Sequence, residues 1–306
     1  MQDKIKQLLS QIQAGDYKAL ARGITHVENE LPGYEDILLQ LKDTQKARVL
    51  GITGPPGAGK STLVNALLHY WIAKGKKIAV IAVDPSSPFN YGALLGDRIR
   101  MTDFYSNPNV YIRSIATRGA LGGLNSKIIE ITDLIKNAPF DLILVETVGV
   151  GQSEVEIAGL ADCTMVALVP EAGDEVQMLK AGIMEIANIF VVNKADRESA
   201  ETLYRNLRTL VHEKTTDGKE IPVIKTIAIQ QQGVADLATA VEDYLYNDHN
   251  LPEKRLHLLT EKSWQLIQAE RMKHIDRKVL KQELSIALKD AHFNLYAFTK
   301  TFREQH

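Results

Sequence analysis

Residues 54–62 of this 306-residue chain read Gly-Pro-Pro-Gly-Ala-Gly-Lys-Ser-Thr, and no other stretch limits the possible fold so strongly. The run matches the pattern G-x-x-x-x-G-K-[ST], in which backbone N–H groups at a helix N-terminus cradle phosphate. A short apolar run at 48–53 predicts a buried strand before it, and residues 63–68 continue as a helix after it. Strand, glycine loop and helix stand in the required order, so we expect a nucleotide-binding protein rather than a glycine-rich turn without a ligand.

The motif assigns roles to its members. We expect the ammonium group of Lys60 to reach the β- and γ-phosphates and the hydroxyl of Ser61 to ligate Mg²⁺. The other nucleotide-binding positions expected in this loop are Gly54, Gly57, Ala58, Gly59 and Thr62.

Composition excludes several other classes of protein. The 36 basic and 38 acidic residues give a net charge of −2, so no overall positive field favours nucleic acid or an anionic membrane. One cysteine, Cys163, stands in an apolar run and is expected to be a buried, inert thiol. The amphipathic N-terminus and the lack of an apolar run of transmembrane length predict a cytoplasmic protein without a membrane partner.

Apolar runs alternate with helical patterns from residue 48 to about 247. The strands expected after the first are 78–83, 110–115, 142–145, 164–169, 189–192 and 222–227. Buried strands separated by helices predict an α/β fold with a doubly wound, mostly parallel sheet. We therefore divide the chain into an N-terminal helical extension (1–47), a nucleotide-binding P-loop domain (48–247) and a C-terminal helical arm (248–306).

Ligands of such sheets bind beyond the carboxyl ends of the strands, which makes residues 193–196 informative. The run Asn193-Lys194-Ala195-Asp196 follows a strand and matches the guanine-recognition pattern N-K-x-D. The carboxylate of Asp196 can accept from both N1–H and the exocyclic amine of guanine, which adenine cannot offer. Lys194 is expected to lie along the base and Asn193 to brace the loop. A helix-capping aspartate in an ordinary turn is the alternative, but the preceding P-loop favours GTP over ATP.

Carboxylates close two other strands. Glu146 ends one of them and is followed by Gly149, whose backbone N–H can approach the γ-phosphate closely. Asp84 ends the other, and Asp97 follows a loop rich in Pro, Ser and Gly. Each of these acids can hold Mg²⁺ or its waters. An exposed acid at a strand end is the alternative for Glu146, and Asp97 could equally cap the helix that follows it.

Five strings carry a resemblance to a known family: residues 54–62, 82–88, 92–101, 146–154 and 172–177. Together they closely resemble the MeaB/ArgK-like GTPases associated with methylmalonyl-CoA mutase. The resemblance runs from the N-terminal helices through the GTPase core and, more loosely, along the helical tail.

That resemblance implies a GTPase domain that binds GTP or GDP with Mg²⁺, a homodimer, and a chaperone for an adenosylcobalamin-dependent acyl-CoA mutase. It implies that the phosphate and Mg²⁺ residues are Lys60, Ser61, Asp84, Asp97 and Glu146. All of them except Ser61 are expected to be catalytic, and all except Lys60 to bind the metal. It also implies that residues 171–180 form an additional switch that reports the nucleotide state to the mutase.

One departure from the family pattern concerns the last guanine contact. The chain has Thr226-Ile227-Ala228 where the family commonly has a Ser-Ala pair, and we expect the backbone N–H of Ala228 to serve guanine O6. No arginine finger is evident; the candidates are Arg98, Arg100, Arg113 and Arg118.

Two other functions fit parts of the sequence. A nickel metallochaperone GTPase would need a Cys/His cluster, which one cysteine and eight scattered histidines do not favour. A kinase of amino-acid transport components would need a phosphoacceptor, and guanine recognition is atypical for a kinase. Apolar side chains of the tail predict a dimerisation element: Trp264, Leu266, Ile267, Leu280, Leu284, Ile286 and Leu288.

Overall fold

The computed structural model describes most of the chain as two compact units, Met1–Leu251 and Pro252–His306. The described residues are 2–42, 47–84, 101–117, 124–149, 153–170, 183–214, 220–247, 251–290 and 292–305. Several predicted functional residues lie outside these ranges, namely Asp97, Arg98, Arg100, Arg118 and the segment 171–180. The three-part division of the chain into extension, nucleotide domain and arm stays a prediction.

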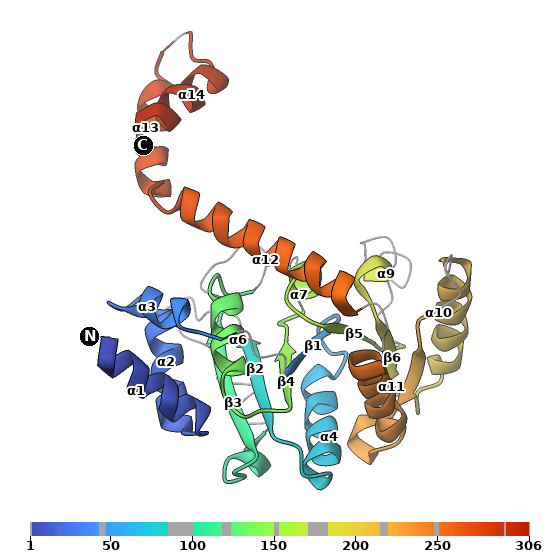
Figure 1. The fold of residues 1–306 in the computed structure, drawn as a ribbon. Helices are drawn as coiled ribbons and strands as arrows, with labels where there is room; N and C mark the ends of the chain where they lie inside the picture. The colour runs from blue at the N-terminus through green and yellow to red at the C-terminus, as the bar shows by residue number, and fades with distance from the viewer. Residues whose placement is uncertain are drawn as a thin grey trace. The chain divides into compact units, whose positions relative to one another are not determined.

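Seven strands of the described part form one parallel sheet in the order β3-β2-β4-β1-β5-β6-β7 (Figure 1). The strands are β1 (Arg48–Thr53), β2 (Ile78–Asp84), β3 (Val110–Ala116), β4 (Leu142–Glu146), β5 (Cys163–Leu168), β6 (Ile189–Asn193) and β7 (Val223–Thr226). Each predicted strand is present with its ends shifted by at most one residue, which confirms the doubly wound α/β fold. β1 lies between β4 and β5, where the strand order reverses, so its carboxyl end opens onto the crevice in which such sheets bind ligands.

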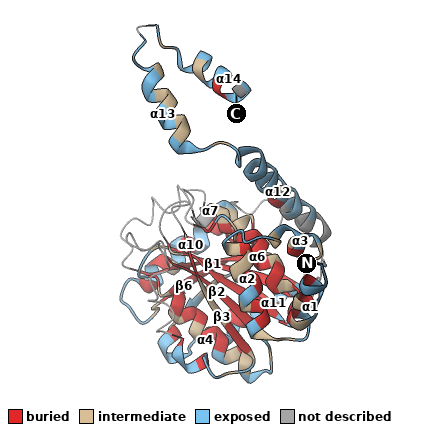
Figure 2. Ribbon diagram, turned by 90° about the vertical axis from the view of Figure 1, so that its left-hand side faces the viewer, coloured by how far each residue is buried: buried red, intermediate tan, exposed pale blue. Residues whose placement is uncertain are grey.

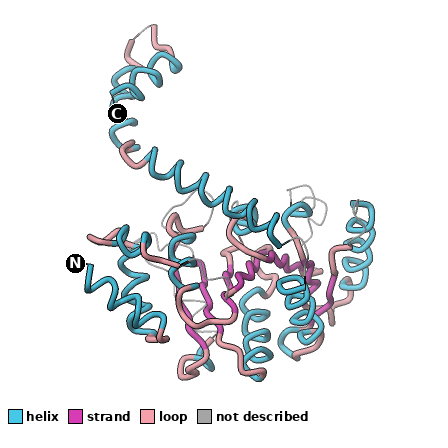
Figure 3. The backbone as a smooth tube through the Cα atoms, viewed as in Figure 1, coloured by secondary structure: helices cyan, strands magenta, loops and turns pink. Residues whose placement is uncertain are grey.

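Helices join these strands and cover both faces of the sheet (Figure 3). Among the described residues, the helices of the first unit are α1 (Gln2–Gln13), α2 (Tyr17–Glu28), α3 (Tyr34–Leu39), α4 (Lys60–Ala73), η1 (Thr102–Phe104), α6 (Ile128–Lys136), α7 (Ser153–Ala158), α9 (Ile183–Ile186), α10 (Ala200–Lys214), η2 (Ala228–Gln230) and α11 (Val234–Asn247). The predicted N-terminal helices are present as α1, α2 and α3.

Alternate residues of the strands point to opposite faces, as the pleat requires. On β1, Leu50 and Ile52 pack against α4 and α11, whereas Val49 packs on the other face with α6, α7 and the N-terminal helices. Both faces are buried, because helices lie on each of them (Figure 2). This double burial explains why the strands read as continuous apolar runs in the sequence.

The second unit contains helices joined by short turns in its described part. Nearly all of α12 (Leu251–Met272) lies in it, together with α13 (Arg277–Ala287) and α14 (Leu295–Gln305). Three of its phenylalanine side chains form a small cluster, in which the ring of Phe298 lies 6.2 Å from that of Phe293 and 5.9 Å from that of Phe302. No residue of α13 is buried.

Two predictions from the composition concern the single cysteine and membrane-spanning helices. Cys163 is buried at the start of β5, as its apolar surroundings predicted. Within the described part of the chain, no helix combines the length and the apolar character needed to cross a membrane.

Candidate nucleotide-binding site

The glycine-rich loop connects β1 to α4 at the centre of the sheet. Gly59 precedes the first residue of α4, Lys60, and has a φ of +81°. A Cβ at Gly59 would lie 2.5 Å from Nδ2 of Asn193, so both the backbone angle and the space require glycine here. The loop therefore leads directly into the N-terminus of α4, where the unpaired amide groups of the first turn can bind phosphate.

Lys60 is buried, and its ammonium group folds back over the loop. It donates to the backbone carbonyl oxygens of Gly54 at 2.8 Å and Pro55 at 3.1 Å. These bonds hold a positive charge over the same loop whose amide groups bind anions. The remaining predicted members, Gly57, Ala58 and Thr62, lie on the loop and in the first turn of α4.

Ser61, in the first turn of α4, contacts Glu146 at the carboxyl end of β4. The Ser61 hydroxyl donates to Oε1 of Glu146 at 2.7 Å, and both residues are buried. The alternative that Glu146 is an exposed strand-end acid is therefore excluded. Asp84 is buried at the carboxyl end of β2, the neighbour of β4, two residues beyond the Ala82 that pairs with Glu146. The structure thus brings three of the four predicted metal-binding residues to one edge, while Asp97 lies outside the described residues.

Gly149 lies directly against the phosphate loop. Its φ is +82°, and a Cβ at this position would collide with Nζ of Lys60 and lie 2.5 Å from the carbonyl oxygen of Gly54. Only glycine can occupy this position without displacing the loop. The segment that follows Glu146 is therefore in contact with the residues expected to hold the β- and γ-phosphates.

A pair of buried threonines fixes this contact, and the sequence analysis did not identify it. The hydroxyl groups of Thr53 and Thr147 lie 2.9 Å apart, and the N–H of Thr147 donates to the carbonyl oxygen of Ile52 at 3.0 Å. The signal was available, since Thr53 directly precedes Gly54 and Thr147 directly follows Glu146.

Asn193 joins three loops at the other side of the crevice. Its Nδ2 donates to the carbonyl oxygen of Ala58 at 3.0 Å, and its Oδ1 accepts from the Thr226 hydroxyl at 3.1 Å and the Ala228 N–H at 3.4 Å. One buried amide side chain therefore locks the phosphate loop to the turns after β6 and β7. Thr226, which is also buried, was missed because the sequence offered only its place before Ala228.

Lys194 and Asp196 lie in the turn after β6. Lys194 has a φ of +55°, and its Nζ donates to the carbonyl oxygen of Gly57 at 2.9 Å. Its methylene chain therefore spans from the turn to the phosphate loop. Asp196 is exposed, and the N–H of Ala195, just before it, donates to the carbonyl oxygen of Thr226 at 3.0 Å. The two turns expected to read the base are thus bonded to each other.

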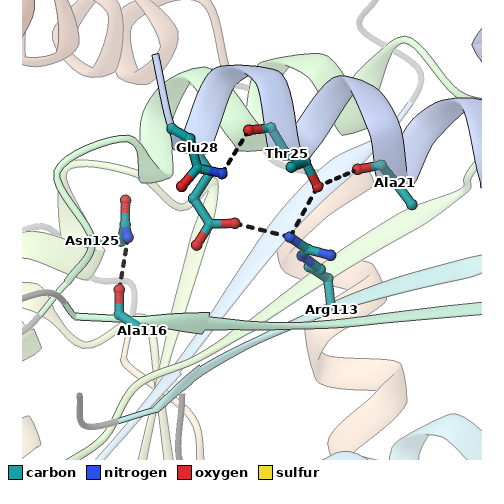
Figure 4. Close-up of polar contacts among 7 residues, drawn as sticks. Ala21, Thr25, Glu28, Arg113, Ala116 and Asn125 are labelled. Atoms are coloured by element: carbon teal, nitrogen blue, oxygen red, sulfur yellow. Dashed lines mark hydrogen bonds and ion pairs between the residues drawn. The ribbon is translucent and has the colours of Figure 1, made fainter. Parts of the chain in front are cut away.

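Arg113, one candidate arginine finger, serves a different purpose. Its guanidinium pairs with the Glu28 carboxylate at 2.9 Å and donates to the Thr25 hydroxyl at 3.4 Å, which joins β3 to α2 (Figure 4). The residue is a link between the sheet and the N-terminal helices rather than a group aimed at phosphate.

A parallel sheet with a Gly-Lys-Ser loop at its switch point, an acid at the neighbouring strand end and an Asn-Lys-x-Asp turn defines a P-loop GTPase. Comparison with known proteins agrees with this class. The family described as methylmalonyl-CoA mutase-associated GTPase MeaB matches residues 20–279. The chain belongs to this family, and it is a GTPase.

The relatives support the same assignment. A putative GTPase of Pyrococcus abyssi is 43% identical over 259 residues, which cover 82% of this chain and 80% of the relative. The GTPase ArgK of Escherichia coli is 35% identical over 251 residues, 78% of this chain and 76% of that protein. A mitochondrial methylmalonic aciduria type A homolog of Caenorhabditis elegans is 38% identical over 209 residues, 63% of this chain and 52% of the relative.

Among solved structures, the chain is similar to a protein described as a LAO/AO transport system kinase. The two share 25% identity with a TM-score of 0.72, and the match covers 99% of this chain and 97% of the other. The similarity extends over nearly the whole length of both chains.

Proposed function

We propose that this GTPase is a slow switch that acts as a chaperone for an adenosylcobalamin-dependent acyl-CoA mutase, such as methylmalonyl-CoA mutase, and controls the loading or protection of its cofactor. The description of the matching family and the name of the C. elegans relative support this role. We also expect the protein to work as a homodimer in the cytoplasm.

Asn193 carries the nucleotide part of the proposal. Its bonds to Ala58, Thr226 and Ala228 join the phosphate loop to the guanine-reading turns, so a phosphate and a purine base can be held at a set separation. Asp196 would accept from guanine N1–H and its exocyclic amine, Lys194 would lie along the base, and the N–H of Ala228 would serve O6 by giving up its long bond to Asn193.

Hydrolysis needs no protein nucleophile in this arrangement. Water would attack the γ-phosphate in line, while the loop amides and Lys60 stabilise the charge spread over its oxygens. For this, the ammonium group of Lys60 would exchange its bonds to the Gly54 and Pro55 carbonyl oxygens for phosphate oxygens. The N–H of Gly149, in contact with the same loop, would approach the γ-phosphate.

The oxygen donors of Ser61, Glu146 and Asp84 suit Mg²⁺, which is commonly bound by one or two carboxylates together with substrate phosphates and water. Ser61 and Glu146 would hold the ion, directly or through its waters, in place of their mutual hydrogen bond. Asp84 and Asp97 are the other proposed ligands. When bound, the ion would neutralise charge on the β- and γ-phosphate oxygens.

The mutase role is tested by measuring GTP turnover with and without a cobalamin-dependent acyl-CoA mutase. We expect the mutase to bind the protein and to stimulate hydrolysis, and charge reversal at Asp174 and Glu175 to remove the stimulation without changing nucleotide affinity. These acids lie in the segment 171–180, the proposed switch, outside the described residues. If no such mutase binds or stimulates the wild type, the chaperone role is wrong; if the variant is stimulated normally, only the role of the segment is.

The name of the structural neighbour raises a second candidate, a protein kinase of transport components. Radiolabelled γ-phosphate distinguishes the two functions. Release as inorganic phosphate supports the switch, whereas transfer to a transport protein would support the kinase.

A further inference from the structure

The residues Leu124–Lys127, which lead into α6, contact three separate parts of the first unit. They touch α7, the carboxyl end of β3 and the N-terminal helices. Each contact is made by a hydrogen bond or an ion pair of a different residue, so the segment is a junction at which these parts meet.

The contact with α7 is made by Glu156. Its Oε2 accepts a hydrogen bond from the backbone N–H of Leu124 at 3.2 Å, and burial raises the pKa of this carboxyl group. α7 itself packs tightly on β1, because a Cβ at Gly51 would lie 2.5 Å from Cγ1 of Ile157. α7 starts four residues after Gly149 in the sequence, so a movement of the Gly149 segment reaches Glu156 through a short stretch of chain.

The contact with β3 is made by Asn125, which is buried. Its Nδ2 donates to the carbonyl oxygen of Ala116, the last residue of β3, at 2.7 Å (Figure 4). Its Oδ1 accepts from the N–H of Lys127 at 2.8 Å. The start of α6 is therefore held to the end of the strand by one side chain, which follows Leu124 directly in the chain and is bonded to Lys127.

The contact with the N-terminal helices is made by Lys127. Its ammonium group lies 2.8 Å from the Glu30 carboxylate, 3.2 Å from that of Glu130 and 5.2 Å from the centre of the Tyr34 ring. Burial alone would lower the pKa of Lys127, but the two carboxylates outweigh this effect and raise it. Lys127 thus remains charged and binds the chain between α2 and α3.

Two further contacts make the attachment of the N-terminal helices firm. A Cβ at Gly23 of α2 would lie 3.1 Å from Cδ2 of Leu134 on α6, and Arg113 of β3 pairs with Glu28. A shift of α6 or β3 is therefore transmitted to α2, since close-packed side chains move together rather than deform.

We propose that Glu156 and Lys127 are positioning residues that couple the nucleotide state of the site to the N-terminal helices α1–α3. The proposal rests on the proposed contact of Gly149 with the γ-phosphate. Binding of GTP then draws the Gly149 segment and α7 into one of two positions, as in other nucleotide-dependent switches. Glu156 passes this displacement to Leu124, and Lys127 passes it to Glu30. By reciprocity, a molecule that binds α1–α3 changes the preference of the site for GTP over GDP.

Hydrogen–deuterium exchange of the full chain tests this coupling, with GDP and with a non-hydrolysable GTP analogue. In the wild type, exchange is expected to differ between the two nucleotides both in residues 142–158 and in α2. Glu156→Ala and Lys127→Ala keep the first difference and reduce the second, because the Gly23–Leu134 and Arg113–Glu28 contacts remain. Glu156→Gln retains the full difference in α2, because the amide oxygen of glutamine still accepts from the N–H of Leu124. As a matched control, Lys225→Ala removes an ion pair of the same length, 2.8 Å to Glu201, and changes neither difference.

Nucleotide affinities provide a second readout that simple loss of stability would not move. Each alanine variant is expected to change the ratio of GTP to GDP affinity roughly two- to fivefold, and the double variant no more than either single one, since both break the same connection.

The outcomes separate this inference from the function on which it rests. If hydrogen exchange in residues 142–158 of the wild type is the same with both nucleotides, the proposed γ-phosphate contact of Gly149 is wrong. If these residues respond but α2 does not, or if α2 responds as strongly in both alanine variants as in the wild type, the coupling through Glu156 and Lys127 is overturned. Additive changes of the affinity ratio in the double variant would overturn it as well.

Discussion

The two units of the chain use apolar side chains in opposite ways. In the first unit, α4 buries Leu63, Leu67 and Trp71 completely or almost so between the sheet and α11. In the second, Trp264 is 60% exposed, Ile286 67% and Tyr296 84%. The nucleotide site is therefore built within a self-contained core, whereas the C-terminal helices keep large apolar surface in water.

This difference indicates that the two units have different roles. Burying apolar surface contributes about 25 cal/mol per Å², so a group of exposed aromatic and aliphatic side chains favours association with a partner. Of the seven residues predicted to form a dimerisation element, Leu280 and Leu284 are half-buried and the other five are exposed. A second copy of the chain is the partner we predict, and the alternative is packing on the chain's own first unit.

The largest effect is expected from Lys60→Ala, which tests whether nucleotide chemistry belongs to the first unit alone. Removal of the only ammonium group that the motif places over the phosphate loop is expected to slow GTP hydrolysis roughly 100- to 1,000-fold. The oligomeric mass should not change. Steady-state turnover and light scattering measure the two properties. Lys225→Ala, at an exposed lysine of β7, is the control; wild-type turnover in Lys60→Ala would remove the phosphate loop from the mechanism.

Asp196→Asn is expected to have the next largest effect and again to spare the second unit. The carboxamide cannot accept both guanine N–H groups, and its N–H₂ can donate to the 2-oxo group of xanthine. Loss of these hydrogen bonds to guanine should weaken the binding free energy of GTP by about 3 kcal/mol, which lowers GTP affinity roughly 100-fold. The variant should then prefer xanthosine triphosphate. Binding titrations with both nucleotides check this.

Glu198→Gln, an exposed acid in the same turn, is the control for Asp196→Asn. Unchanged GTP affinity in the Asp196 variant would place the base elsewhere.

Shortening the chain to end at Asn250 removes the second unit and tests the other half of the comparison. We expect the full chain to be a dimer and the shortened chain to be a monomer with unchanged GTP affinity. Light scattering measures the mass and titration the affinity. A shortened chain that still dimerises would assign the interface to the first unit, and a monomeric full chain would contradict the homodimer itself.

The smallest effect concerns the pH dependence of stability within the first unit. Burial raises the pKa of Glu156, so between the usual carboxyl pKa of about 4.3 and the raised value the folded chain holds more protons than the unfolded one. The contribution of Glu156 to the free energy of unfolding therefore falls as pH rises through this window. Glu156→Gln should gain stability relative to the wild type over the same range.

Urea unfolding of both proteins in parallel measures this difference in stability. A difference that stays constant or falls with pH would show that burial does not control this carboxyl group.

Most strands of the first unit were predictable from the sequence, because each one is a continuous apolar run. Strands covered on both faces, such as β2 and β4, must be apolar throughout, so their sequence runs marked them to within one residue. The site residues on the phosphate loop and after β6 could be proposed from the sequence, because anion and guanine recognition require particular residue types at fixed short spacing. Thr53, Thr147 and Thr226 were not identified, because their hydrogen bonds join residues far apart in the sequence, although Thr53 and Thr147 stand next to motif residues.

The sequence by itself thus determined the order of elements, the class of ligand and most of the residues at the carboxyl edge of the sheet, because local chemistry carries these properties. Only the tertiary structure decided which distant residues meet. Arg113 and Glu28 are 85 positions apart, and Lys127 and Glu30 belong to separate predicted regions. In the sequence, each of these charged residues looks like an ordinary surface residue. The packing of whole helices decides which two of them pair, and this packing leaves no local sequence pattern.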